Sequence, residues 1–308
     1  MRLWSRRSFI ATAAGSALGA LGLAGYGFAV EPALRLRVQR YALTPPGWVP
    51  GLRLRLAVLA DIHAGMPSMP MDRVRHIVEV ANALEPDLIL LLGDYANTDR
   101  FLDIRADWSE VIPALTALKA PLGRYAILGN HEWWDDPSAQ KARRGPTVAH
   151  GIFARTDIPL LENDAVRLSK DGRPFWLLGL GDQLAFHIAR RRQEGIDDLP
   201  GTLAKVTDDA PAILLAHEPD IFPKVPRRVS LTLSGHTHGG QVRLFGWSPV
   251  VPSKYGNRYA YGHVVEDGRH LIVSGGLGTV SAGLAPVRLG VPPEIVLVEL
   301  GGDGGTVS

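Results

Sequence analysis

The chain has 308 residues, of which 46% are hydrophobic and 21% are charged, a composition typical of globular rather than disordered proteins. Its 33 basic and 31 acidic residues give a formal charge of +2, which excludes a strongly basic nucleic-acid binder. The absence of cysteine excludes disulfides, zinc–thiolate sites, iron–sulfur clusters and cysteine nucleophiles. Any metal must therefore be held by His, Asp, Glu or Asn.

Residues 1–30 differ from the rest of the chain because they contain three arginines and no acidic residue. The segment 9–30 is uncharged, rich in Ala, Gly and Leu, and long enough to cross a bilayer. Arg6 and Arg7, followed by Ser-Phe-Ile, resemble a twin-arginine export signal. We expect a twin-arginine signal or an N-terminal membrane anchor. The body is then exported by the twin-arginine machinery and is periplasmic, or anchored to the outer face of the cytoplasmic membrane.

Two alternatives stay open for this leader. An ordinary anchor helix with incidental arginines fits the same residues, and Gly27-Phe28-Ala29 offers only a weak cleavage site. No linker rich in Pro or Ser divides the remainder, so residues 31–300 are expected to form one domain. The Gly-rich segment 301–308 is expected to be a disordered tail.

Short apolar runs predict strands that alternate with helices in the first half of the body. We expect strands at 34–43, 52–59, 87–92 and 124–128, and helices at 71–84 and 108–118. The second half contains more strands, expected at 166–168, 175–179, 212–216 and 230–233 and near 240–245, 270–274 and 294–300, with a helical or irregular stretch at 184–208. This pattern predicts an α/β fold with a second sheet.

Five of the expected buried strands end in residues that can bind metals. These residues are Asp61 and His63, then Asp94, then Asn130 and His131, then His217, and finally His236 and His238. Ligand sites of open α/β sheets lie beyond the carboxyl ends of the strands. One isolated Gly-Asp or Gly-Asn-His is most often a turn, but five such strand ends together predict a metal site.

These residues carry a resemblance to a known family. The sequences Asp61-Ile62-His63, Gly93-Asp94, Gly129-Asn130-His131-Glu132, Ala216-His217 and Gly235-His236-Thr237-His238 resemble, in this order, the motifs of calcineurin-like metallophosphoesterases. Ser253–Gly256 and Gly290–Glu294 resemble the C-terminal pattern of the bacterial exported or membrane-associated members with a twin-arginine leader. The resemblance implies two packed mixed β-sheets flanked by helices, a four-layer α/β/β/α sandwich.

The resemblance also implies a role for each residue. The first metal would be bound by Asp61, His63 and His238, the second by Asn130, His217 and His236, and both by Asp94. The ions would be two divalent metals, namely Mn, Fe or Zn. His131 would protonate the leaving oxygen as general acid while a metal-bridging hydroxide attacks phosphorus. Glu132 is a candidate for orienting His131.

The implied function is metal-dependent hydrolysis of phosphate esters, with phosphodiesters preferred and no nucleic-acid partner. One alternative is hydrolysis of a lipid-linked pyrophosphate at the membrane. Another is a metal-stabilised envelope scaffold without turnover, although the retained His131 argues against it. The sequence identifies no substrate-binding residue.

Three features outside the motifs have two readings each. Trp133-Trp134 either packs a loop or forms a substrate platform or membrane-facing edge. Arg190–Arg192 is either a solvated helix face or an attractor of anions. The segment 255–259 is either ordinary structure or a substrate-facing loop.

Overall fold

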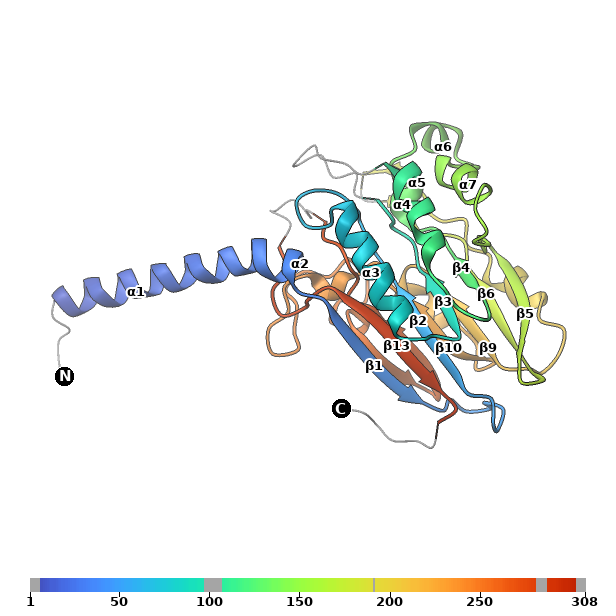
Figure 1. Cartoon of the computed structure of the whole chain (residues 1–308). Helices are drawn as coiled ribbons and strands as arrows, with labels where there is room; N and C mark the ends of the chain where they lie inside the picture. The colour runs from blue at the N-terminus through green and yellow to red at the C-terminus, as the bar shows by residue number, and fades with distance from the viewer. Residues whose placement is uncertain (1–5, 97–106, 191, 281–286, 303–308) are drawn as a thin grey trace.

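The computed structural model describes residues 6–96, 107–190, 192–280 and 287–302. Two mixed β-sheets pack against each other at its centre (Figure 1). The first has five strands in the spatial order β1 (Arg37–Leu43), β13 (Glu294–Leu300), β2 (Leu54–Leu59), β3 (Leu88–Leu91) and β4 (Arg124–Ala126). The second has six, in the order β11 (Gly262–Glu266), β12 (Arg269–Val273), β10 (Val229–Ser234), β9 (Ala212–Leu215), β6 (Arg173–Gly179) and β5 (Asp164–Lys170).

Each sheet contains a parallel set of strands. Strands β2, β3 and β4 run parallel in the first sheet, and β12, β10, β9 and β6 run parallel in the second. Strands β13, β11 and β5 each join these sets in the antiparallel direction. Parallel strands deliver their carboxyl ends to one edge of a sheet, so the loops that follow them are brought together there.

Alternation of side chains along the strands explains the layers. Leu56 and Val58 of β2 point into the core between the sheets, whereas Ala57 and Leu59 point to the outer face. That outer face is covered by helices α3 (Met71–Ala83), α4 (Trp108–Ala114) and α7 (Val148–Phe153). Helix α8 (Leu199–Ala204) and the 3₁₀ turn Pro219–Lys224 cover the second sheet. The expected four-layer α/β fold is confirmed.

The second half of the chain differs from expectation in three places. Residues 240–245 form no continuous strand, because Val242 and Leu244 make only isolated β-bridges, to Leu289 and Trp247. Strand β11 was not expected because its residues after Gly262 alternate between exposed and half-buried. The stretch expected to be helical or irregular at 184–208 contains a hairpin, β7 (Phe186–Ala189) and β8 (Arg192–Glu194). Arg190 and Arg192 therefore lie on a hairpin and not on a helix face, and Arg191 lies outside the described residues.

The N-terminal helix projects from the body (Figure 1). Helix α1 (Arg6–Gly25) continues through a π-helical turn, Tyr26–Val30, into α2 (Glu31–Leu34). Its residues Gly15–Leu34 have a mean hydropathy of 1.3 and could cross a membrane by length and composition, as a signal sequence also could. The helical segment is attached to the body at its end, because the backbone N–H of Arg288 donates to the carbonyl of Gly27 at 2.8 Å.

At the other terminus, residues 301 and 302 remain bonded to the body. The Gly301 N–H donates to the carbonyl of Leu43 at 3.2 Å, and the Thr44 hydroxyl donates to the carbonyl of Gly302 at 3.1 Å. Residues 303–308 of the expected tail lie outside the described residues.

Candidate metal centre

The loops that follow five parallel strands meet at one edge of the two sheets. Asp61, Asp94 and Asn130 follow β2, β3 and β4, while His217 follows β9, and His236 and His238 follow β10. The backbone locks neighbouring loops together, since the Asp61 N–H donates to the Gly93 carbonyl and the His63 N–H to the Asp94 carbonyl. The structure thus brings all seven ligands expected from the sequence into one cluster, in which all but the half-buried His236 are buried.

The first group of donor atoms belongs to Asp61, His63 and His238, which lie within 4.8 Å of one another. The Nε2 atoms of His63 and His238 are 3.2 Å apart, and His238 Nε2 is 3.7 Å from Asp61 Oδ1. Asp94 is close as well, because its Oδ2 atom lies 3.4 Å from His63 Nε2.

The second group is built around the same carboxylate. Asp94 Oδ2 lies 3.2 Å from His217 Nε2, and that nitrogen lies 3.2 Å from Asn130 Oδ1. The Asn130 oxygen is also 2.8 Å from His236 Nδ1. Asp94 is therefore in contact with both groups, which is the position required of a shared ligand.

The chemistry of these donors fits divalent cations. Asp61 is fully buried, and its Oδ2 atom has no hydrogen-bond partner within the part of the chain that the structure describes. Burial raises the pKa of Asp61 to about 7, and the charge of Asp94 adds to this effect. A buried carboxylate is costly unless a cation or a donor compensates it, and mixed oxygen and imidazole donors suit Mn, Fe or Zn.

The backbone of the site is strained in a consistent way. Five candidate ligands have positive φ angles, namely Asp61 (51°), His63 (42°), Asp94 (56°), His236 (65°) and His238 (51°). Non-glycine residues rarely adopt this region, and each such residue costs of order 1–3 kcal/mol. Strain concentrated on ligands indicates that the fold is organised around their convergence.

Two glycines make this convergence possible. A Cβ atom at Gly235 would lie 2.5 Å from Asp61 Oδ2, and one at Gly129 would overlap the Asp94 carboxylate and the His217 ring. The side chains of the candidate ligands therefore occupy the space that a Cβ atom at position 129 or 235 would need.

His131 lies at the rim of the cluster and remains partly exposed. Its backbone N–H donates to Asp94 Oδ1 at 2.9 Å, and its ring is 5.0 Å from that of His63. Its Nδ1 atom is 2.9 Å from Oδ2 of Asp135, the residue that caps the C-terminus of α5 (Asn130–Trp134). Burial opposes protonation of His131, but the charges of Asp94 and Asp135 outweigh it and raise the pKa of His131 to about 9.

Glu132 has a different role from the expected one. Its fully buried carboxylate accepts the backbone N–H groups of Asp94, Tyr95 and Gly129 at 2.8 to 2.9 Å. Glu132 thus joins the loops that carry Asp94 and Asn130. The group next to the ring nitrogen of His131 is Asp135, which the sequence analysis missed although its i+4 spacing was visible.

Arg288 is a second residue that the sequence analysis missed. It is fully buried, and its guanidinium lies 3.1 Å from His238 Nδ1. It also donates to the carbonyls of Gly278 and Val291 at 2.8 and 2.9 Å. Arg288 thereby holds the His238 ring in position through its Nδ1 atom.

The two tryptophans after His131 separate into two environments. Trp133 is buried in the core, in agreement with the packing interpretation. Trp134 lies beside His131, with 5.6 Å between ring centroids, and its Nε1 donates to the carbonyl of Leu184 at 2.7 Å. In the segment 255–259, Tyr259 is buried, so that residue does not face a substrate.

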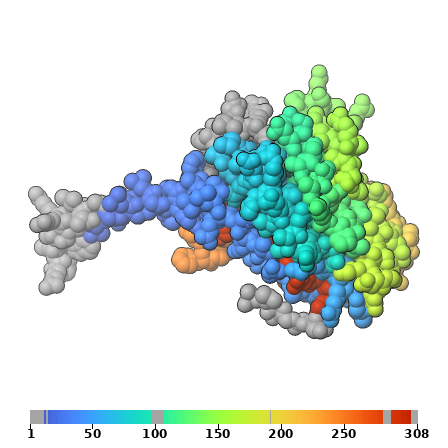
Figure 2. Space-filling model, in the orientation of Figure 1, coloured from blue at the N-terminus to red at the C-terminus, as the bar shows by residue number. Residues whose placement is uncertain are grey.

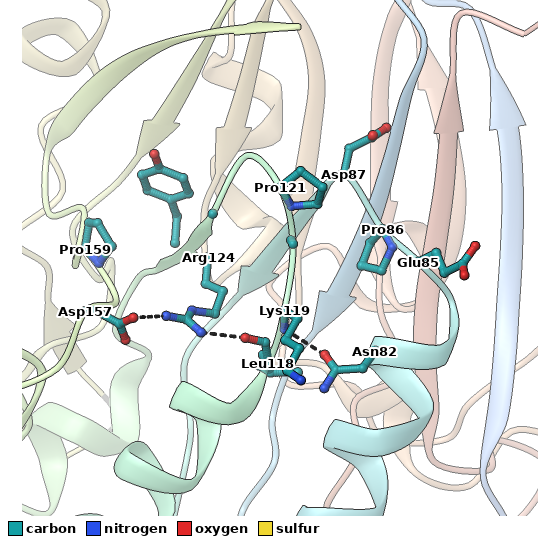
Figure 3. Close-up of a pocket in the computed structure, with 13 residues that line it drawn as sticks. Asn82, Glu85, Pro86, Asp87, Leu118, Lys119, Pro121, Arg124, Asp157 and Pro159 are labelled. Carbon is teal, nitrogen blue, oxygen red and sulfur yellow. Dashed lines mark hydrogen bonds and ion pairs between the residues drawn. The ribbon is translucent and has the colours of Figure 1, made fainter.

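A cavity of about 350 Å³ lies beside His236. Gln183, Lys224, Asp197 and Lys254 are among the residues that line it. A different cavity, of about 800 Å³, lies at the opposite ends of β3 and β4 (Figure 3). It is lined by Asn82, Arg124 and Asp157 among others, and is remote from the metal ligands.

Comparison with known proteins identifies the family. The profile of the calcineurin-like phosphoesterase family matches residues 54–240. The chain is 30% identical over 310 residues to the uncharacterized metallophosphoesterase YkuE of Bacillus subtilis, covering 97% of this chain and 99% of the relative. It is 30% identical over 273 residues to phosphodiesterase YaeI of Escherichia coli, covering 83% and 89%. It is 28% identical over 250 residues to a Bos taurus transmembrane protein with a metallophosphoesterase domain, covering 79% and 52%. The chain therefore belongs to the calcineurin-like phosphoesterase family and is a phosphoesterase hydrolase.

Proposed function

We propose that this chain hydrolyses phosphodiesters with two divalent metal ions, which are Mn, Fe or Zn. The observation that carries the proposal is the position of Asp94, whose carboxylate lies within 3.4 Å of a ligand nitrogen in each of the two donor groups. The name of the Escherichia coli relative, a phosphodiesterase, supports the choice of diesters.

In this proposal each donor group holds one ion. Asp61, His63 and His238 would hold the first, Asn130, His217 and His236 would hold the second, and Asp94, which contacts both groups, would serve both. Two ions in these places would neutralise the phosphate and lower the pKa of a water between them. Arg288 and Glu132 keep the ligands in place through the contacts described above.

His131 is the proposed general acid. It is the partly exposed imidazole at the rim, so a leaving oxygen can approach it, and Asp135 holds its Nδ1 atom. A correctly placed proton donor accelerates departure of an alkoxide by about 10²–10⁴-fold. The cavity beside His236 is the proposed place for the part of the substrate that does not react. Its lining combines Lys224 and Lys254 with the carboxyl groups of Asp197, Glu218 and Asp220.

For localisation, we propose that residues 1–30 act as a twin-arginine signal or anchor and that residues 31–300 form the catalytic domain on the outer side of the cytoplasmic membrane. The apolar helix and the Arg6-Arg7 pair support this arrangement. The same helix favours a second candidate substrate, a lipid-linked pyrophosphate, because it would hold the active site near a lipid surface.

The test is hydrolysis of bis-p-nitrophenyl phosphate and p-nitrophenyl phosphate by the full chain with Mn²⁺, Zn²⁺ or EDTA, and with Asp94→Asn as the control. Metal-dependent cleavage of the diester that disappears in Asp94→Asn is expected. Cleavage of the monoester alone would contradict the diester preference. No cleavage of either ester by a folded chain with two bound metals would favour the lipid-linked substrate or a scaffold.

A further inference from the structure

An exposed apolar turn lies at the foot of the N-terminal helix. Residues Leu244, Phe245, Trp247 and Val250 are 48%, 107%, 59% and 63% exposed, within seven consecutive positions. Large apolar side chains grouped in this way on a surface mark a site of interaction. Figures 1 and 2 show this orange segment protruding beside the foot of the blue helix.

Backbone hydrogen bonds connect the turn to that helix through one short segment. The Arg288 N–H donates to the carbonyl of Gly27, at the helix foot. The next residue, Leu289, pairs with the backbone on both sides of Val242, because its carbonyl accepts from Arg243 and its N–H donates to Gln241. Arg288 therefore bonds to the N-terminal helix, and Leu289 bonds to the backbone that leads into the turn.

Backbone hydrogen bonds fix the turn, and its phenylalanine adopts an energetically unfavourable backbone conformation. Leu244 and Trp247 exchange both backbone hydrogen bonds, so Phe245 and Gly246 form a two-residue hairpin loop. Both have positive φ angles, 52° and 79°, as in a type I′ turn. Asn or Asp is normally preferred at the first position, because a bulky side chain is strained there. Phe245 is nevertheless fully exposed, and nothing in the part of the chain that the structure describes covers it.

We propose that residues 244–250 insert into the interface of the lipid bilayer that the N-terminal helix enters. The inference rests on the proposed anchor role of that helix. Aromatic residues favour the boundary between headgroups and acyl chains, and the last helical residues Phe28 and Leu34 are exposed beside the same foot. The helix and the turn would then hold the body against the membrane at two points instead of one.

This arrangement brings the active site close to the lipid. Arg288, whose backbone contacts the helix foot, also touches the metal ligand His238. Pro252, Ser253 and Lys254, which follow the turn directly, line the cavity beside His236. A phosphate ester carried on a lipid headgroup would reach this cavity along the membrane-bound turn, whereas a soluble ester would enter from water.

The absence of cysteine allows a direct test. The full chain carrying Val250→Cys is labelled with an environment-sensitive fluorophore and reconstituted into phosphatidylcholine–phosphatidylglycerol vesicles that contain headgroup-region nitroxide lipids. Val265→Cys, on β11 and 54% exposed, is the matched control. We expect a blue-shifted emission and several-fold stronger nitroxide quenching at position 250 than at position 265.

Removal of the aromatic residues should abolish the difference in nitroxide quenching between positions 250 and 265. In the labelled Val250→Cys chain, Phe245→Asn with Trp247→Ser should reduce the quenching to the level of the control, and Asn suits the positive φ of the turn. Hydrolysis of soluble diester should not change. Equal quenching at positions 250 and 265 in a chain that floats with the vesicles would overturn the inference and leave the anchor standing. A chain that does not float would overturn both, whatever its activity.

Discussion

Replacing Gly93 by alanine should damage the metal centre far more than the same change at another strained glycine. Gly93 connects β3 to Asp94 and has a φ of +93°. A Cβ atom there would overlap the backbone of Gly129, which precedes Asn130. Backbone atoms cannot rotate away as a side chain can, so the loops that carry Asp94 and Asn130 must separate.

The loss of unfolding free energy can be worked out by comparison with Gly47. This glycine has a φ of +75°, and a Cβ atom added there would have nothing within 4 Å. Gly47→Ala should lower the free energy of unfolding by roughly 1–2 kcal/mol, because only the left-handed backbone is penalised. Gly93→Ala carries the same penalty and also overpacking, which typically costs about 1–3 kcal/mol or more. We expect a total of about 2–5 kcal/mol for Gly93→Ala.

Thermal unfolding of both variants, with and without EDTA, measures these values, and elemental analysis measures bound metal. At roughly 2–4 °C per kcal/mol for a domain of this size, Gly93→Ala should unfold about 4–20 °C below the parent chain. It should also lose bound metal and turnover, whereas Gly47→Ala keeps both. Equal shifts in the two variants would refute the reasoning, since they would mean that backbone strain alone matters and that the contact with Gly129 is relieved without cost.

Three further changes test the proton donor and the support of the ligands. His131→Ala should keep its bound metal. Its kcat should fall by about 10²–10⁴-fold on diesters with poor leaving groups and much less on p-nitrophenyl esters, and steady-state rates on both kinds of ester measure this contrast. Asp135→Asn should lose roughly tenfold with the same dependence on the leaving group; a uniform loss across esters would contradict its role in holding His131. Arg288→Met should lower the free energy of unfolding, measured by denaturant titration, by about 3–5 kcal/mol. The carbonyls that accept from the guanidinium would stay buried without a partner. Arg288→Lys should not restore the lost stability.

The architecture, and the convergence of the candidate metal ligands at one edge of the sheets, could be predicted from the sequence. The strands that end at Asp61, Asp94 and His217 are short, apolar and followed directly by polar residues, so both local structure and place in the sheet were visible. The hairpin β7–β8 was not visible, because its short strands are held by contacts with distant segments. One such contact is the His187 N–H, which donates to the side-chain oxygen of Gln140.

The supporting residues were harder to predict for a different reason. A single arginine such as Arg288 is usually exposed, and nothing in its neighbours indicates that distant carbonyls and a histidine surround it. Glu132 was recognised as part of a motif, but only the fold reveals that its carboxylate accepts three backbone N–H groups. Sequence motifs thus point to the candidate ligands, while the groups that hold those residues in place are revealed by tertiary contacts.

Strand β13 has a consequence for how the protein is made. It is nearly the last element to be synthesised, yet it hydrogen-bonds to β1 on one side and to β2 on the other, within the first sheet. At roughly 5–20 residues per second, the apolar N-terminal helix leaves the ribosome many seconds before this strand exists. The helix can therefore be recognised while the body is still incomplete. A chain that stops before residue 294 would contain all seven candidate ligands, but β1 would have lost the strand that joins it to β2 in the first sheet.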